Sequence, residues 1–259
     1  MIQALIMSNS PTSARSGRES TLVKHHLASV LKEEIVHGRL APGQRIVEGK
    51  WARQFGVAQA SVREAINLLL AEGFVTKNSG RSARVIRYTE QDVARIYEVR
   101  AALEGMAAHL VAQNQPDLAP LHEALDQMRA AIETRDVRRL IESDGRFHLS
   151  LCELSGNQFL CDLARRTLAP LFAFVLLRVL ISGQGPEAWV ADLGRHQHVL
   201  DMLREGDPAL AEQYVRRALR RFASSAYAVW DNVGGSVEAH LLGRQLRSGT
   251  RSSKEKRSV

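Results

Sequence analysis

The stretch QFGVAQASVREAINLLLAEGFV, from Gln54 to Val75, places a glycine-marked turn, a short polar run and an apolar helix in that order. Gly56 and Gly73 mark the ends of two helical segments, because glycine readily adopts the left-handed conformation that ends a helix. The second segment begins near Gln59 and carries its apolar residues on one face at helical spacing. The second helix of a helix-turn-helix lies in the major groove of DNA. The stretch therefore predicts a DNA-contacting helix.

The flanking sequence extends this pattern to a winged helix-turn-helix. Apolar residues recur at helical spacing between Leu22 and Ile35, which predicts a helix ahead of the two others. Two short β segments, near Val75–Lys77 and Ala83–Arg87, flank the hairpin signal Asn78-Ser79-Gly80. Three helices followed by a β-hairpin make a winged helix-turn-helix DNA-binding domain, which we assign to residues 20–88.

Between Glu90 and about Trp230 the sequence has helical periodicity and no strand pattern. Clusters of proline, glycine, serine and asparagine divide this region into six amphipathic segments with short links. The predicted helices cover approximately residues 90–113, 117–134, 136–155, 157–182, 186–205 and 207–231. Amphipathic helices joined by short links form antiparallel bundles. The predicted fold is therefore mainly α, with the winged helix-turn-helix followed by an all-α six-helix antiparallel bundle at residues 90–231.

The two ends of the chain lack periodicity. Residues 1–19 are rich in Ser, Thr and Gly, and residues 232–259 are polar, rich in Gly and Ser, and basic. Such segments bury too little apolar surface to offset the entropy of ordering, so we expect both to be disordered. A basic tail is also able to add a nonspecific contact to DNA.

The composition indicates a protein with a buried core and no membrane segment. Hydrophobic residues make up 45% of the chain, which is ordinary for a globular protein. The most apolar stretch, Leu168–Ser182, is interrupted by Arg178 and is too short to span a bilayer. The N-terminus has no basic segment ahead of an apolar one, so no signal peptide is predicted. With only two cysteines, Cys152 and Cys161, we expect a cytoplasmic protein without a disulfide framework.

Charge is distributed unevenly along the chain, whose net charge is +7. Residues 21–88 carry eleven Lys and Arg against five Asp and Glu, whereas residues 89–231 carry sixteen against twenty. A basic unit is suited to a polyanion such as DNA. We expect the larger, mildly acidic unit to have a different task.

Polar residues near the start of the predicted recognition helix are candidates for contacts with bases. Arg63 is the strongest, because a guanidinium can form a pair of hydrogen bonds with guanine O6 and N7. Gln59 is suited to adenine or to a phosphate. The alternative for Arg63 is an exposed cation that pairs with Asn67 or Glu64. The predicted DNA-contacting residues, which include two phosphate contacts at the preceding helix and three residues at the wing tip, are Lys50, Arg53, Gln59, Ser61, Arg63, Ser79, Gly80 and Arg81.

In the helical region, Asp144 and His148 are spaced i, i+4 and so project from one helix face. A carboxylate and an imidazole on one face make half of a site for a divalent metal such as Zn or Ni. His196, on a later helix, is a candidate third ligand. The alternative is an Asp–His hydrogen bond inside the bundle, with His196 a satisfied core residue.

Arg100 lies in the first bundle helix with Glu104 one turn later. An exposed pair at this spacing would contribute only ~0.3–0.5 kcal/mol. The functional alternative is that Arg100 binds the carboxylate of an effector, since a guanidinium matches a carboxylate with two hydrogen bonds. We include Arg100 among the predicted effector-binding residues, together with the three candidate metal ligands.

Longer motifs resemble a known family. The segment IVHGRLAPGQRIVEGKWARQFGVAQASVREAINLLLAEGFV resembles the DNA-binding domain of GntR-type regulators in its GRLAPG, FGV, SVREA and LxxEGFV elements. The helical remainder resembles the FadR-type effector domain, called FCD, in IYEVRAALEGMAA, DGRFHLSLCELSGN and RHQHVLDMLREGD. The resemblance covers about residues 22–230, and the six-helix count is similar to the VanR-like branch.

The resemblance carries implications for individual residues. Similar members hold a metal with one Asp and three His, and the last His would fall at Ala218, so the fourth ligand is missing here. Tyr214, one turn before Ala218, is a candidate to line the effector pocket instead. Many members also have Arg at the positions of Gly49 and Gln59, so this chain departs from the family's usual operator-contacting set.

The resulting hypothesis is a homodimeric transcriptional regulator, with repression the expected mode. It would bind a pseudo-palindromic operator in double-stranded DNA and respond to a small organic-acid effector, with a metal ion assisting. One alternative is a metal-dependent hydrolase built on the candidate ligands, but no general base or nucleophile motif supports it. The other is a nonspecific nucleic-acid-binding protein, which leaves the acidic helical unit unexplained.

Overall fold

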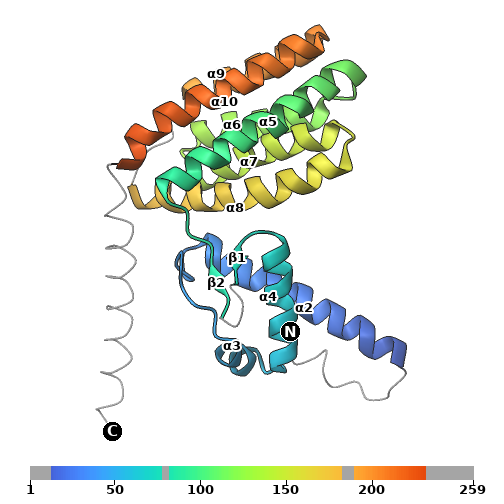
Figure 1. Ribbon diagram of the computed structural model, residues 1–259, viewed down its shortest axis with the longest axis vertical. Coiled ribbons are helices and arrows are strands. Elements are labelled where there is room, and N and C mark those ends of the chain that lie inside the picture. The colour runs from blue at the N-terminus through green and yellow to red at the C-terminus, as the bar shows by residue number, and fades with distance from the viewer. Residues whose placement is uncertain (1–12, 78–81, 183–189, 232–259) are drawn as a thin grey trace.

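The N-terminal unit is built from three helices and a small β-hairpin, the order that the sequence predicts (Figure 1). The structure is a computed structural model that describes residues 13–77, 82–182 and 190–231. The helices are α2 (Ser13–Val36), α3 (Glu48–Phe55) and α4 (Gln59–Ala71). Strands β1 (Val75–Thr76) and β2 (Arg84–Val85) pair antiparallel with Val75 opposite Val85.

Helix α2 begins earlier than the sequence indicated. Residues 13–19, which the sequence placed in a disordered segment, form the first turns of α2. Apolar periodicity marks only the part of a helix that packs against a core, here from Val23 and Leu27 onward, and a helix can continue past it. Residues 1–12 and the predicted tail at 232–259 lie outside the described residues.

The core of this unit explains why α3 and α4 form a helix-turn-helix. Helix α4 buries Val62, Ile66 and Leu69 against α2, as its apolar face predicts. Gly56 ends α3 with a positive φ of 67°, and its N–H donates to the carbonyl of Ala52. This left-handed residue turns the chain between the two helices, because glycine adopts the conformation without steric cost.

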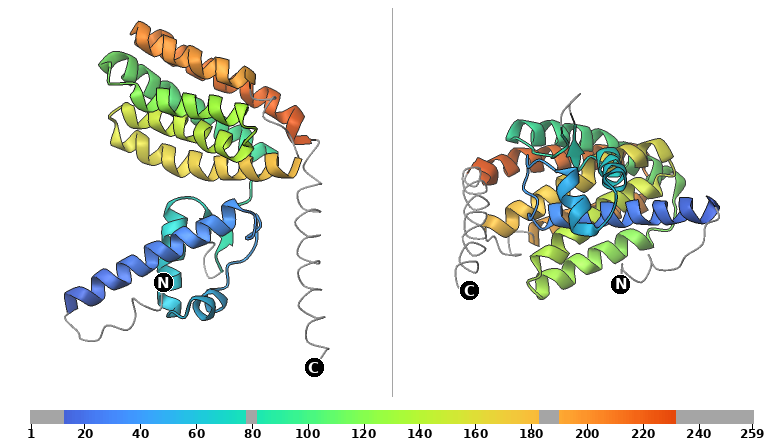
Figure 2. Two further views of the ribbon diagram at one scale, coloured as in Figure 1. Left: turned by 180° about the vertical axis from the view of Figure 1, so that it is seen from behind. Right: turned by 90° about the horizontal axis from the view of Figure 1, so that it is seen from below.

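The remainder of the described chain is the predicted helical bundle. Its helices are α5 (Glu90–Asn114), α6 (Ala119–Glu133), α7 (Val137–Leu154), α8 (Gln158–Ser182), α9 (Val190–Glu205) and α10 (Pro208–Asp231). The long α10 lies along α5, while α6, α7 and α8 lie side by side beneath them (Figures 1 and 2). A capping box at Thr89, whose side chain accepts from the N–H of Asp92, starts α5 sharply.

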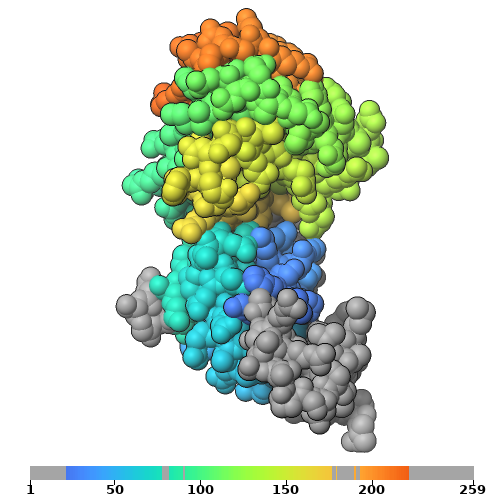
Figure 3. Space-filling model, turned by 90° about the vertical axis from the view of Figure 1, so that its right-hand side faces the viewer, coloured from blue at the N-terminus to red at the C-terminus, as the bar shows by residue number. Residues whose placement is uncertain are grey.

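The two units meet along α8, as the space-filling view shows (Figure 3). Ala169 and Ala173 of α8 pack against the core of the N-terminal unit. Gly73, directly after α4, has φ +80°, and a Cβ there would lie 2.7 Å from the carbonyl oxygen of Arg166. Pro170 lies four residues after Arg166 and has no N–H to donate to that carbonyl. The turn that follows α4, the predicted recognition helix, therefore rests directly on the α8 backbone.

Two sequence expectations concern thiols and membranes. Cys152 and Cys161 are both free and buried, and burial raises the pKa of each thiol. Among the described helices, none is long and apolar enough to cross a bilayer.

Candidate metal centre and DNA-binding surface

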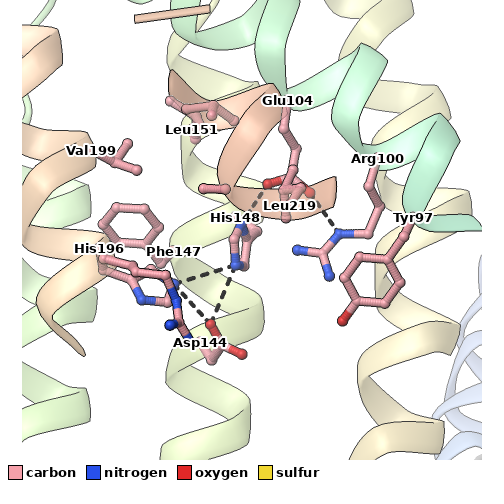
Figure 4. Close-up of a pocket in the computed structure, with 13 residues that line it drawn as sticks. Tyr97, Arg100, Glu104, Asp144, Phe147, His148, Leu151, His196, Val199 and Leu219 are labelled. Atoms are coloured by element: carbon pink, nitrogen blue, oxygen red, sulfur yellow. Dashed lines mark hydrogen bonds and ion pairs between the residues drawn. The ribbon is translucent and has the colours of Figure 1, made fainter. Parts of the chain in front are cut away.

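Three side chains from two helices converge inside the bundle (Figure 4). Asp144 and His148 lie one turn apart on α7, and His196 comes from α9. Asp144 Oδ1 lies 3.3 Å from His148 Nε2 and 3.0 Å from His196 Nε2, and the two Nε2 atoms are 3.3 Å apart. Asp144 and His196 are buried. The structure thus brings together the three residues that the sequence selected as metal ligands.

A second carboxylate, from α5, lies behind His148. The His148 Nδ1 is 2.5 Å from Glu104 Oε2, and Glu104 is 1% exposed. An ionised carboxylate only accepts hydrogen bonds, so Nδ1 carries the donated proton and Nε2 faces Asp144. Carboxylates placed in this way behind a histidine orient it toward a metal. Sequence reasoning treated Glu104 only as a partner of Arg100, because nothing local indicated that α5 and α7 would meet here.

Arg100 occupies the other side of Glu104. Its Nε donates to Glu104 Oε1 at 2.7 Å, and its side chain is 2% exposed. The guanidinium also lies over the rings of Tyr97, at 4.6 Å, and Phe172, at 5.1 Å. Its Nη2 is buried and has no hydrogen-bond acceptor among the described residues. A buried donor without a partner is costly, so this atom is suited to an acceptor from a ligand.

Charge pairing sets the protonation of the two carboxyl groups. Burial alone would raise the pKa of Glu104, but the Arg100 guanidinium and His148 outweigh burial and lower it to about 2. Burial likewise opposes the charge of Asp144, yet its close contacts with His148 and His196 hold its pKa well below the usual range. Both carboxylates are therefore ionised near neutral pH.

The two imidazoles differ in their protonation. Burial is the largest influence on His148 and disfavours its charged form, but Glu104 and Asp144 together outweigh burial and raise the pKa of this imidazole overall. Burial lowers the pKa of His196, and Asp144 only partly offsets that effect. The two carboxylates therefore favour a second proton on His148 at Nε2, the atom that faces Asp144, and a divalent cation would replace that proton.

The separations between these atoms fit a divalent ion. Zinc bonds to His and Asp are about 2.0–2.2 Å long, so ligand atoms around a tetrahedral ion lie about 3.3–3.5 Å apart. The observed separations are 3.0, 3.3 and 3.3 Å. Asp144 Oδ1 is at ion-pair distance from both imidazoles, yet no well-directed hydrogen bond reaches it from the described residues. The donor set and its spacing therefore suit Zn or Ni.

These groups line a cavity of about 60 Å³. A water molecule occupies about 30 Å³ in the liquid, so the cavity has room for only a few non-hydrogen atoms. Its far wall is formed by α10, through Val215, Ala218 and Leu219. Ala218, where the family resemblance implies a fourth ligand, therefore faces the pocket with a methyl group.

Tyr214, which the sequence suggested as a pocket residue, does not lie in the wall of this cavity. Tyr214 stacks on His198 at 5.9 Å and is absent from the cavity wall. Successive side chains leave a helix about 100° apart, and it is the next residue, Val215, that faces the cavity. Counting one helical turn back from Ala218 does not determine whether residue 214 or residue 215 faces the cavity.

Phe172 of α8 packs against two of the charged side chains that line the cavity, His148 and Arg100. Its ring stacks on His148 at a centroid distance of 5.6 Å and lies under Arg100. Gly145 of α7 permits this approach, because a Cβ there would lie 3.0 Å from the Phe172 ring. Two residues that line the cavity thereby contact the same helix that carries the N-terminal unit.

The predicted DNA-contacting residues that the structure describes lie on α3 and α4. Lys50, Arg53, Gln59 and Arg63 are exposed, and Ser61 is half-buried. Ser79, Gly80 and Arg81 at the wing tip lie outside the described residues.

Arg63 is paired, but with a residue that the sequence did not suggest. Its Nε and Nη2 donate to Glu48 Oε2 of α3 at 3.1 and 2.9 Å. Glu64, one of the expected partners, instead lies 3.5 Å from Lys24 of α2. Spacing in the sequence does not predict pairs between two helices, because the geometry of the α3–α4 turn determines which side chains meet.

Comparison with known proteins tests the fold and the class. Residues 24–85 match bacterial regulatory proteins of the gntR family, and residues 95–221 match the FCD domain. A probable D-xylose utilization operon transcriptional repressor of Paenarthrobacter nicotinovorans is 30% identical over 220 residues, which cover 85% of this chain and 93% of that protein. This chain belongs to the gntR family. It carries an FCD domain and is a DNA-binding transcriptional regulator, not an enzyme.

Two further relatives set the range of likeness. The gluconate operon transcriptional repressor of Bacillus licheniformis is 23% identical over 232 residues, covering 88% of this chain and 90% of that protein. A solved structure of a GntR regulator from Rhodococcus sp. RHA1 has a TM-score of 0.66 at 22% identity, covering 79% of this chain and 97% of that one. At that identity the structure supports the fold of this gntR-family regulator and nothing finer.

Proposed function

We propose that this regulator is a homodimeric repressor whose binding to a pseudo-palindromic operator is controlled by a small carboxylate in the bundle pocket. Asp144, His148 and His196 hold a divalent cation, Zn or Ni, and a cation there supplies a Lewis-acid contact for one effector oxygen. Arg100 binds the carboxylate. Residues 20–88 form the DNA-binding domain, and residues 90–231 form the effector and dimerisation domain of the VanR-like branch.

The observation that carries this proposal is the buried, unpartnered Nη2 of Arg100. Arg100 already satisfies Glu104 through Nε, so Nη2 is available to a second carboxylate. A guanidinium held rigidly between two aromatic rings loses little entropy when it binds such a group. The ion pair with Glu104, which also contacts His148, holds the guanidinium of Arg100 in place.

The size of the pocket narrows the class of effector. A cavity of about 60 Å³ favours a hydroxy acid of two or three carbons, which needs only a small expansion of the cavity, over a longer sugar acid or an aromatic acid. A larger acid would require α10 or Phe172 to move. Ala218 leaves one side of the ligand set without a protein donor, which leaves room for an effector oxygen. The similar D-xylose and gluconate operon repressors support control by a small metabolite.

A thermal-shift titration tests the proposal. A ligand that binds only the native protein stabilises it by RT ln(1 + [L]/Kd). Short hydroxy acids are expected to raise the melting temperature in the presence of Zn²⁺ or Ni²⁺ and to lose most of that effect with a chelator. Equal stabilisation with chelator would remove the metal from the proposal and leave Arg100 as the effector's main contact.

A pair of neighbouring histidines provides the matched control. His196→Ala removes a proposed ligand and is expected to abolish the metal-dependent part of the shift. His198→Ala removes an exposed imidazole two residues away, outside the cavity wall, and is expected to behave like the unaltered protein. Identical behaviour of the two variants would refute the proposed ligand set.

A further inference from the structure

The DNA-binding face contains two contacts between α3 and α4 that go beyond the family resemblance. Both join the first turn of α3 to polar residues of α4 that the sequence selected as base contacts. Glu48 and Gly49 are consecutive on α3, and their partners Arg63 and Gln59 lie one turn apart on α4. Figure 1 shows α3 next to the start of α4, on the side of the N-terminal unit away from the bundle.

The first contact fixes the orientation of Arg63. Glu48 accepts from Nε and Nη2 on one side of the guanidinium. A guanidinium has five N–H groups in a fixed plane, so the edge formed by Nη1 and Nη2 is not used by Glu48. That edge has two parallel donors, which is the arrangement that pairs with guanine O6 and N7. The Arg63 side chain is 55% exposed, so the free edge is accessible.

The second contact places Gln59. Its Nε2 lies 3.2 Å from where a Cβ of Gly49 would be, and Arg53 Nη1 lies 3.9 Å from the same point. The carboxamide of Gln59 therefore rests on the bare backbone of α3. A longer side chain at residue 49 would occupy that space. The two departures from the family, Gly49 and Gln59, are thus one structural feature.

We propose that Gln59 and Arg63 determine operator specificity together, with Gly49 and Glu48 as their positioning residues. Gln59 pairs with an adenine through N6 and N7, and Arg63 pairs with a guanine. Four residues of helix span about 6 Å and one base step spans about 3.4 Å. The two base pairs therefore lie within about two steps of each other in each half-site. This proposal rests on the sequence-specific operator binding proposed above.

Selection of binding sites from random double-stranded DNA by the full-length protein tests this assignment. Affinities for single-base variants of the selected site then give a discrimination ratio at each base pair. Gln59→Ala is expected to lose about 5- to 150-fold in discrimination at the A·T pair alone, the range typical of one bidentate contact. Gly49→Leu is expected to cause a partial loss at the same pair, although leucine favours the helix more than glycine does.

Glu48→Gln has a matched control in Glu64→Gln. Both variants remove one negative charge beside Arg63, so both strengthen nonspecific attraction to DNA to a similar degree. Only Glu48 bonds to the guanidinium, since Glu64 pairs with Lys24. Discrimination at the G·C pair is expected to fall at least about fivefold in Glu48→Gln and to stay unchanged in Glu64→Gln.

The outcomes separate this proposal from the one on which it rests. Equal discrimination by Glu48→Gln and Glu64→Gln, or an intact base preference in Gln59→Ala, would overturn the assignment while leaving operator binding in place. Failure of the unaltered protein to enrich any sequence would overturn sequence-specific operator binding itself.

Discussion

At the scale of residues, the pocket contains a series of buried polar groups, each paired with the next by a hydrogen bond or an ion pair. Arg100 and Glu104 are both buried, and a buried charge without a partner is strongly destabilising. Glu104 satisfies Arg100 with one oxygen and His148 with the other. His148 in turn faces Asp144 and His196. The polar contacts therefore run from Arg100 and Glu104 on α5 to the candidate metal ligands on α7 and α9.

Glu104→Gln tests this organisation. Losing the carboxylate removes the group that holds the His148 proton on Nδ1, so metal affinity is expected to fall by about 10- to 100-fold. Competition with a metal-binding dye measures the affinity. Glu98→Gln, an exposed change on the same helix, is the control and is expected to bind metal normally. Unchanged affinity in Glu104→Gln would show that Glu104 serves Arg100 alone.

Ala218→His tests the missing fourth ligand. Residue 218 faces the cavity, so a histidine there is expected to complete the ligand set and raise metal affinity by about tenfold or more, equivalent to at least ~1.4 kcal/mol. The effector response is expected to weaken, because the added imidazole occupies the position proposed for an effector oxygen. Ala209→His, on an exposed position of the same helix, is the control and should change neither property.

At the scale of elements, α8 has a position that no other described helix shares. Phe172 stacks on His148, which lines the pocket, while Ala169 and Ala173 pack against the core of the DNA-binding unit. Between them, Pro170 leaves the carbonyl of Arg166 without its helical donor, and that carbonyl faces Gly73. A shift of Phe172 on effector binding would therefore act close to the end of the recognition helix.

Gly73→Ala and Gly56→Ala form a matched pair that measures this contact. Both glycines have positive φ, at +80° and +67°, but only at Gly73 would a Cβ meet other atoms. Each change is expected to cost about 1–2 kcal/mol for its backbone conformation. Gly73→Ala is expected to cost about 1–3 kcal/mol more because of crowding against α8. Urea unfolding measures both, and equal losses would mean that α8 yields without cost.

At the scale of the whole molecule, the two units are coupled only if effector and DNA favour different arrangements of them. Coupling of this kind is reciprocal. An acid that weakens operator binding by a given factor is expected to bind the operator-bound protein more weakly by the same factor, typically about 5- to 150-fold. Calorimetric titration of the acid with and without saturating operator measures the second factor.

One outcome of this titration would contradict the proposed coupling between effector and operator. An acid that releases the operator but binds free and DNA-bound protein equally well does not act through the proposed coupling. The same titration on Arg100→Lys is a useful comparison, since lysine keeps the charge but loses the bidentate fork.

Much of the fold follows from local patterns in the sequence. The glycines at 56 and 73, the apolar stripe of α4 and the breaks between the bundle helices predicted the order and class of the elements, with bundle boundaries mostly within a few residues. These features depend on near neighbours in the chain, namely helix periodicity and the conformational freedom of glycine. Residues 13–19 escaped prediction because their sequence shows no apolar period, although they form the start of α2.

The sequence by itself also determined the family and the identity of the three candidate metal ligands, since Asp144 and His148 share a helix face by spacing alone. Only the tertiary structure decided that Glu104 supports His148, that Glu48 holds Arg63 and that Val215 faces the pocket in place of Tyr214. These contacts join helices that are distant in the chain. Their geometry depends on how the helices pack and rotate, and no local periodicity contains that information.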